Sequence, residues 1–322
     1  MLKTASFFRI GPEYALPPLD ALEQVLQAAR FVPCGATQPE SYGWIPPRGK
    51  KSSILAELVD GKLILSLCTE RRAVPSSALK AAVEDKIERY KKETGMERVA
   101  AKIKKDFKEE ALLDLLPRAF TKKSSTMLWV DTANKMLVVG TGSSASADKV
   151  VTALMEALTA VPGGSPGLVF KPVQTQQSAA SSMSQWLSTR EAPFNFTVDR
   201  DCELKTPDEH KSSVRYSRHT LEIDEVPQHI AAGKVPTQLA MTWNDRLSFV
   251  LTENAQVKKI QLLDVVLEGV DKPGKDEDGF DTDAAIITGE LSGMIPDLLD
   301  ALGGELEVGG AIGTVQDAIA TA

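Results

Sequence analysis

Four cations recur at a spacing that could hold phosphate groups. The sequence predicts a helix over about Glu97 to Glu110, and Arg98, Lys102, Lys105 and Lys108 form a stripe on one side of it. The apolar residues of another face are Met96, Val99, Ile103 and Phe107. A row of cations backed by an apolar anchor can bind the phosphates of duplex DNA, because neutralised phosphates and released counterions supply affinity without base contacts.

The same pattern is also typical of a solvated helix face, and Glu109 lies within the stripe. A second predicted helix, Lys80 to Lys92, spreads cations around its circumference among three acids. These cations could form intrahelical ion pairs instead of contacting a ligand.

The segment LLPRAF, Leu115 to Phe120, ends the basic region. Pro117 removes a backbone donor and disfavours helix at Leu116, so Phe120 is expected beyond the helix. Such a phenylalanine either folds back into the core or stays exposed as an aromatic anchor for a second subunit.

Other chemistry finds little support in the sequence. The turn Gly140 to Ser144 lacks both the third glycine of a dinucleotide fold and the Lys of a phosphate loop, which leaves a nucleotide-binding enzyme as a remote alternative. His210, His219 and His229 fit no metal spacing. We therefore expect no catalytic residues, no metal and no cofactor.

Charge is segregated along the chain of 322 residues, whose formal net charge is -7. Residues 80–123 carry 13 Lys and Arg against 9 Asp and Glu, while the rest carries 24 against 35. A wholly basic nucleic-acid coat is excluded, so any anion site must be local. Three scattered cysteines and no membrane-spanning apolar run predict a soluble, cytoplasmic protein.

Three β-hairpins are predicted from apolar runs around polar turns. They span Ser53–Leu67 with a turn at Asp60-Gly61, Ser125–Thr141 with a turn at Ala133–Lys135, and Thr237–Glu253 with a turn at Asn244-Asp245. Helical spacing follows the first two, after Pro75 and after Gly142. These ββα units predict an α+β protein built on antiparallel sheets with a helical tip.

Polar, Gly-rich and acidic stretches predict loops and boundaries. Val161–Gly167 and Gln174–Gln185 are expected to be linkers, and Asp271–Asp283 an acidic loop. A buried segment at Ile286-Ile287 is expected to run into a helix that stops at Gly303-Gly304, and Val308–Ala322 is expected to be loosely held.

Several motifs, in order along the chain, together resemble the bacterial recombination-associated RdgC family. They are FVPCG at 31–35, GWIPP at 43–47, VPSSALKAAVEDKI at 74–87, LLPRAF at 115–120, TMLWVDT at 126–132, HIAAGKVPTQLAMTW at 229–243, FDTDAAIITGEL at 280–291 and LGGE at 302–305. Residues 160–225 and the tail from Val308 match the family pattern poorly.

The resemblance implies a non-enzymatic, ring-shaped homodimer that binds duplex DNA without sequence preference and restrains RecA-promoted strand exchange in the nucleoid. Binding to single-stranded DNA stays open as an addition. The implied DNA-binding residues are Lys80, Lys86, Arg89, Arg98, Lys102, Lys104, Lys105, Lys108, Arg118, Lys122, Lys123 and Lys234. The implied dimer contact consists of Leu116, Pro117 and Phe120, with Phe120 matching the family's tip-to-tip phenylalanine.

Three domains are expected on this basis. A discontinuous central α+β domain takes 1–75, 125–165 and 235–265; a helical basic tip takes 76–124; and a base domain takes 166–234 and 266–322. The alternative function is a structural nucleoid or protein-docking factor that acts through the Phe120 loop.

Overall fold

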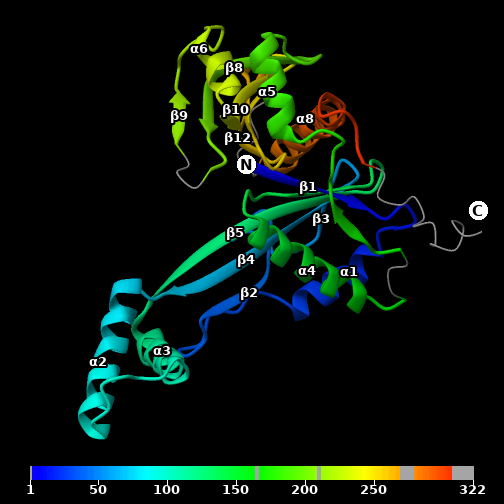
Figure 1. Cartoon of the computed structure of the whole chain (residues 1–322). Coiled ribbons are helices and arrows are strands. Elements are labelled where there is room, and N and C mark those ends of the chain that lie inside the picture. The colour runs from blue at the N-terminus through cyan, green and yellow to red at the C-terminus, as the bar shows by residue number, and fades with distance from the viewer. Residues whose placement is uncertain (1, 164–166, 209–211, 269–278, 307–322) are drawn as a thin grey trace, which may run out of the picture. The chain divides into compact units, whose positions relative to one another are not determined.

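The computed structural model describes residues 2–163, 167–208, 212–268 and 279–306, and its contacts divide the chain into two units (Figure 1). Unit 1 consists of residues 1–11, 133–144 and 169–322, and unit 2 of residues 12–132 and 145–168. Both units combine helices with antiparallel strands, so the expectation of an α+β fold is confirmed. The expected tail from Val308 lies outside the described residues.

Unit 2 is built on an antiparallel sheet in the order β2-β4-β5, with β3 also paired to β4. Its strands are β2 (Glu40–Ile45), β3 (Glu57–Val59), β4 (Lys62–Ala73) and β5 (Phe120–Asp131). Its helices are α1 (Leu19–Ala28), α2 (Ser76–Thr94), α3 (Ala101–Leu115), the short 3-10 helix η1 (Leu116–Arg118) and α4 (Ser144–Ala160). The expected turn at Asp60-Gly61 joins β3 to β4.

The core of unit 2 lies where the strands are apolar. Trp129, Leu65 and Leu128 are at most 1% exposed, and α1 and α4 cover the sheet in Figure 1. Helix α4 buries Val150, Leu154 and Leu158. These three residues are the ones whose spacing predicted the helix, because an i, i+4, i+8 row of apolar side chains faces one side.

Unit 1 contains an antiparallel sheet in the order β6-β1-β12-β11-β10-β8-β9, with β7 also paired to β1. Its strands are β1 (Thr4–Ile10), β6 (Met136–Val139), β7 (Phe170–Pro172), β8 (Phe196–Lys205), β9 (Ser213–Tyr216), β10 (Val235–Trp243), β11 (Leu247–Thr252) and β12 (Val257–Leu262). Its helices are α5 (Ala179–Thr189), α6 (Glu225–Ala231), α7 (Asp264–Leu267) and α8 (Phe280–Ala301). The predicted hairpin turning at Asn244-Asp245 is present as β10 and β11.

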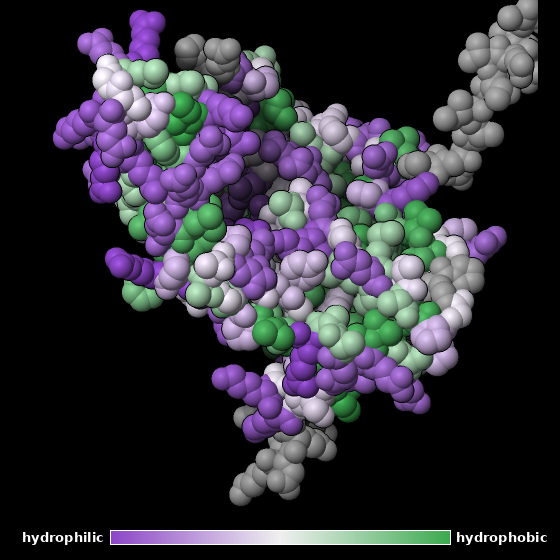
Figure 2. Space-filling view, turned by 90° about the horizontal axis from the view of Figure 1, so that it is seen from below, coloured by the Kyte–Doolittle hydropathy of each residue, from purple (hydrophilic) through white to green (hydrophobic). Residues whose placement is uncertain are grey.

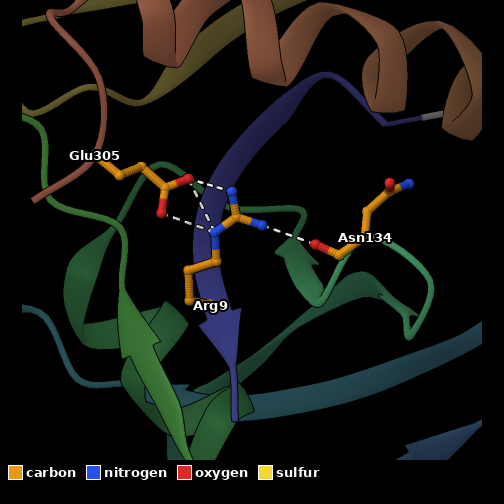
Figure 3. Close-up of polar contacts among 3 residues, drawn as sticks. All are labelled: Arg9, Asn134 and Glu305. Atoms are coloured by element: carbon orange, nitrogen blue, oxygen red, sulfur yellow. Dashed lines mark hydrogen bonds and ion pairs between the residues drawn. The ribbon is translucent and has the colours of Figure 1, made fainter. Parts of the chain in front are cut away.

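An ion pair fastens the segment that follows α8 to the first strand (Figure 3). Nε of Arg9 donates to both carboxylate oxygens of Glu305, at 2.9 and 2.8 Å, and Nη1 donates to the carbonyl oxygen of Asn134 at 2.7 Å. One guanidinium on β1 thus joins the turn before β6 to the chain after α8, within unit 1. The helix itself ends where the sequence predicted, since Gly303 and Gly304 both have positive φ.

The prediction of a linker over Gln174–Gln185 is wrong, because α5 occupies Ala179–Thr189. Ser178 caps this helix by accepting a hydrogen bond from the backbone N–H of Ser181. The buried side chains of Met183, Trp186 and Leu187 fix it against unit 1. Serine and glutamine content suggested a loop, but capping and the apolar spacing decide the structure.

The acidic stretch predicted over Asp271–Asp283 is described only from Gly279 onward. Helix α8 begins at Phe280, so Asp281 and Asp283 lie in its first turn and not in a loop. Acidic side chains are favourable there because they face the positive end of the helix dipole.

No helix in the described part of the chain combines the length and the apolar character needed to cross a bilayer. On the face shown in Figure 2, hydrophilic residues cover much of the surface and hydrophobic residues are interspersed among them.

Candidate nucleic-acid interface

The two longest strands of unit 2 run from a buried end to an exposed end. Strand β4 is buried over residues 62–68 and exposed at Arg71 and Ala73, while its partner β5 is exposed over 120–125 and buried from Leu128. The residues change in the same way, from LILSL to ERRA and from FTKKSS to LWVD. The polar ends of β4 and β5 therefore form an exposed ribbon, to which β2 is paired as far as Arg71, and Figure 1 shows α2 and α3 at its end.

The helices α2 and α3 share a small contact area, called the seam below, which includes Tyr90, Phe107 and Ala111. The rings of Tyr90 and Phe107 meet edge to face with centroids 5.6 Å apart, and Ala111 is the only buried residue described in either helix. Helix α2 follows Pro75 as predicted and ends at Gly95, whose φ of 70° is left-handed. Most side chains of this helix pair consequently face solvent.

Lys86 is part of this seam and is engaged in ion pairs. Its Nζ lies 3.2 Å from a carboxylate oxygen of Glu110 and 3.0 Å from one of Asp114, both on α3. The hydrogen bonds to Asp114 and Glu110 raise the pKa of the Lys86 ammonium. Because two carboxylates already neutralise it, Lys86 contributes more to joining the helices than to attracting phosphate.

The cations of α3, unlike Lys86 of α2, are exposed to solvent. Ile103 and Phe107 are half-buried, whereas all four lysines of this helix are exposed. They are Lys102, Lys104, Lys105 and Lys108. Among the described residues, only Lys105 of these four forms an ion pair, with its Nζ 3.8 Å from a carboxylate oxygen of Glu109, and an exposed pair of this kind is weak. Lys104 and Lys108, one helical turn apart, thus present a cationic face of α3 to solvent.

Arg98 does not belong to this face, which corrects the predicted stripe. Helix α3 begins at Ala101, so Arg98 lies in the loop between the helices, where Met96 is also exposed. The predicted start was too early because Gly95 ends α2 and the chain needs several residues to reverse direction.

The other expected DNA-binding residues are distributed between the two units. Lys80 pairs weakly with Glu84 at 3.8 Å on α2, and Lys123 lies 3.7 Å from Glu70 and 5.1 Å above the ring of Phe31. Lys234 belongs to unit 1, in the loop between α6 and β10. Within the described residues no acidic partner is found for a larger set of cations in unit 2, namely Arg89, Arg98, Lys102, Lys104, Lys108, Arg118 and Lys122.

Phe120 is the first residue of β5 and its side chain is 88% exposed. Its backbone is paired with Ala73 on β4, so the exposed ring stands on an ordered strand and not on a free loop. Of the two alternatives left by the sequence, folding into the core of its own chain is excluded. An exposed ring leaves about 1.5–3 kcal/mol of burial free energy available to a partner.

Leu116 and Pro117 differ in their accessibility. Leu116 is only 2% exposed and packs inside its own chain, whereas Pro117 is exposed. Leu116 therefore cannot reach a second subunit, and the exposed residues of η1 are Pro117 and Arg118.

A further cation was not singled out from the sequence. Arg71 of β4 stands directly opposite Lys122 of β5, and its side chain is 60% exposed. Nε of Arg71 donates to Glu40 at 2.9 Å, and Glu40 also pairs with Lys149. The signal was the double arginine at 71–72, which a strand places on opposite faces of the ribbon.

Two other kinds of site find no support in the described residues. A Cβ atom on Gly142 would lie 2.7 Å from Cε of Lys258 and 2.9 Å from Cγ2 of Thr4, so side chains already fill the space above this glycine. Nowhere in the described ranges do three His, Cys, Asp or Glu residues gather in a group that could hold a metal ion.

The sequence was compared with protein families and with individual proteins. Residues 1–305 match the RdgC family model, whose description reads "Putative exonuclease, RdgC". Three relatives are each named "Recombination-associated protein RdgC". That of Herminiimonas arsenicoxydans is 38% identical over 94% of this chain and 98% of its own length. That of Janthinobacterium sp. (strain Marseille) is 38% identical over 95% and 98%, and that of Bordetella pertussis is 36% identical over 95% and 99%.

The family match spans both units, and the similarity to these relatives covers nearly the whole of each protein. The chain belongs to the RdgC family of recombination-associated proteins.

Proposed function

We propose that this protein binds duplex DNA without sequence preference, encircles it as a homodimeric ring and restrains RecA-promoted strand exchange. The observation that carries the DNA-binding part is the cationic face of α3, on which Lys104 and Lys108 are exposed, lie one helical turn apart and have no acidic partner among the described residues. Phosphates can neutralise such cations without first breaking an ion pair.

The charge distribution supports this role. The protein as a whole is acidic, with a formal net charge of -7, so unspecific attraction of DNA to its entire surface is disfavoured. Attraction is instead concentrated at the basic helices and at the ribbon residues Arg71 and Lys122. A surface that contacts only the DNA backbone has no means to read base sequence.

Phe120 supports the homodimer. An exposed aromatic side chain on an ordered strand is a good anchor for a second copy, because its ring loses little conformational freedom when it is buried. If contacts between two copies close a ring around the duplex, the protein leaves DNA slowly even when each phosphate contact is weak.

The biological role follows from occupancy of DNA. The relatives are named for their association with recombination. A ring seated on duplex DNA would obstruct strand exchange by covering the homologous partner, and such a protein would be found in the nucleoid.

The helical basic tip domain in this proposal consists of residues 76–124.

The proposal does not include catalysis. The family description contains the word exonuclease, and phosphodiester hydrolysis usually requires carboxylates that hold metal ions. No such group occurs among the described residues. Incubation of end-labelled duplex with the protein and Mg²⁺ or Mn²⁺ is expected to leave the label intact, and progressive shortening from the ends would overturn this part.

A protein-docking factor is the alternative, and the exposure of Phe120 is the observation that favours it. In that case Phe120 would bind a different protein, and the cations of α3 would remain solvated. The two functions differ in whether the protein binds DNA at low salt.

The test is a titration of fluorescent duplexes of unrelated sequence across a salt series, with single-stranded DNA of the same length as a second probe. The proposal predicts equal affinities for the duplexes and a linear fall of log affinity with log salt, at a slope of about -0.9 per phosphate neutralised. Absence of binding at low salt would remove the DNA-binding function and favour the docking alternative.

A further inference from the structure

Arg72 uses its guanidinium in an unusual way. Nε donates to the carbonyl oxygen of Gly35 at 3.0 Å, and Nη2 to that of Cys34 at 3.4 Å. Nη1 donates to the carbonyl oxygens of Leu116 and Ala119, both at 3.2 Å. Among the described residues Arg72 has no carboxylate partner, so its donors serve the backbone alone.

These four carbonyls come from two segments that the strand pairing does not connect. Cys34 and Gly35 belong to the loop between α1 and β2, whereas Leu116 is the first residue of η1 and Ala119 directly follows it. The carbonyls at the end of a helix lack intrahelical partners and carry partial negative charge, so a cation is well placed there. One side chain thus fastens both segments to β4.

Glu70, on the same face of β4, completes the attachment of the loop. This carboxylate is 3% exposed and accepts a hydrogen bond from the backbone N–H of Cys34 at 2.6 Å. The backbone of the Cys34–Gly35 loop therefore donates to Glu70 and accepts from Arg72. The loop forms a fixed support on which Arg72 is itself oriented.

The same contacts fix the backbone on which Phe120 stands. Its preceding carbonyl, that of Ala119, is held by Arg72, and its own backbone is paired with Ala73. On the other side Leu116 is buried and its carbonyl oxygen also accepts from the N–H of Ala119 at 3.1 Å. These contacts determine the path of the backbone into Phe120, although the ring of Phe120 is itself exposed and is not packed in the core.

We propose that Arg72 is the positioning residue of the dimer contact: it orders the Leu116–Phe120 segment in the free chain so that Phe120 is presented in its binding direction. This inference rests on the proposed function in that the contact is taken to be Phe120 with a second copy. Preorganisation of an anchor raises affinity because the ordering cost is not incurred on binding.

Lysine is the informative substitution, because it keeps the positive charge but lacks the planar fork that reaches both segments. Arg71 offers a matched control on the neighbouring position. It faces the opposite side of the ribbon and donates to the side chain of Glu40, not to the backbone. Arg72→Lys and Arg71→Lys therefore each replace a guanidinium by an ammonium at neighbouring positions, but only Arg72 donates to the backbone carbonyls.

The first measurement is hydrogen exchange of the Ala119 amide in dilute protein without DNA. We expect Arg72→Lys to speed this exchange about tenfold or more, since hydrogen bonds from a charged donor are lost, and Arg71→Lys to leave it unchanged. Unchanged exchange in Arg72→Lys would overturn the inference. Exchange in α4 serves as the internal check that unit 2 remains folded.

The second measurement is a double-mutant cycle in which analytical sedimentation measures the dissociation constant of the dimer. If Arg72 acts through Phe120, Arg72→Lys weakens the dimer about tenfold in the natural chain and adds no loss in a Phe120→Ala background. If the losses of dimer affinity in Arg72→Lys and Phe120→Ala add in full in the double variant, Arg72 does not act through Phe120 and the inference is overturned. If Phe120→Ala alone leaves the dimer intact, the proposed contact fails, and exchange at Ala119 still decides whether Arg72 orders the segment.

Discussion

Arg71 and Lys122 stand directly opposite each other on the antiparallel strands β4 and β5. Like charges in this position destabilise a strand pair by a few tenths of a kcal/mol or more, about the reverse of what an opposite-charge pair contributes. Glu40 offsets part of this repulsion by accepting a hydrogen bond from Arg71. An arrangement that costs stability is better explained by a ligand with negative charge than by the fold itself.

Replacement of Arg71 by Gln should therefore weaken duplex binding without destabilising the protein. We expect the salt slope of binding to fall by about 0.9, as for the loss of one phosphate contact, and the melting temperature to stay the same or rise. Fluorescence titrations across salt concentrations and a thermal scan would measure both. The contact is contradicted if Arg71→Gln binds DNA with the natural slope.

The α3 face is tested by Lys104→Gln combined with Lys108→Gln. These side chains are one helical turn apart, exposed and without an acidic partner among the described residues, so the salt slope should fall by about 1.8. The matched control is Lys50→Gln with Lys51→Gln, which removes the same charge from exposed positions of unit 2 outside the basic helices. Equal losses in the two double variants would show that only net charge matters.

The seam between α2 and α3 should be locally weak. Phe107→Ala removes the edge-to-face contact with Tyr90, a contribution of about 0.5–1.5 kcal/mol beyond burial. Amide exchange over residues 76–115 should accelerate while exchange in the β4–β5 sheet does not. Leu113→Ala, which truncates an exposed residue of the same helix, should change neither. Acceleration throughout unit 2 would mean that the helix pair is not a separate unit of stability.

Glu70 should make the ribbon sensitive to acid. The hydrogen bond from the Cys34 N–H, together with Thr121 and Lys123, holds the pKa of this carboxyl below its usual range. A lowered pKa in the folded state stabilises the fold above the unfolded-state value of about 4.3, and this stabilisation is lost as the pH falls through the folded-state pKa.

The corresponding variant is Glu70→Gln, which keeps the shape of the side chain but not its charge. Its melting temperature should lie below that of the natural chain at pH 7, and the difference should shrink as the pH falls from about 5 to 3. Glu93→Gln, an exposed control on α2, should show no such trend. A difference that is constant over this pH range would exclude the ionised carboxyl as the cause.

Local signals in the sequence were enough for much of the fold. Asp60-Gly61 and Asn244-Asp245 predicted two hairpin turns that the structure contains, because only certain residues adopt the required backbone angles. Pro75 predicted the start of α2 for the same reason. The helix at Ala179–Thr189 was missed because serine and glutamine content outweighed the spacing of Met183 and Trp186.

The candidate site was less predictable because its chemistry depends on residues far apart in the sequence. Lys86 was counted among the DNA-binding cations, but its partners Glu110 and Asp114 come from another helix. The exposure of Phe120 depends on strand pairing with Ala73, and the role of Arg72 depends on the loop at Cys34. Only the folded chain brings these groups together.

The central claim is that two copies close around DNA through Phe120. The most direct test measures salt-induced release of the protein from a closed circular duplex and from a linear duplex of the same sequence. The account predicts slower release from the circle, and equally fast release from both when Phe120 is replaced by Ala. Equal release rates for the natural chain on the two DNAs would contradict it.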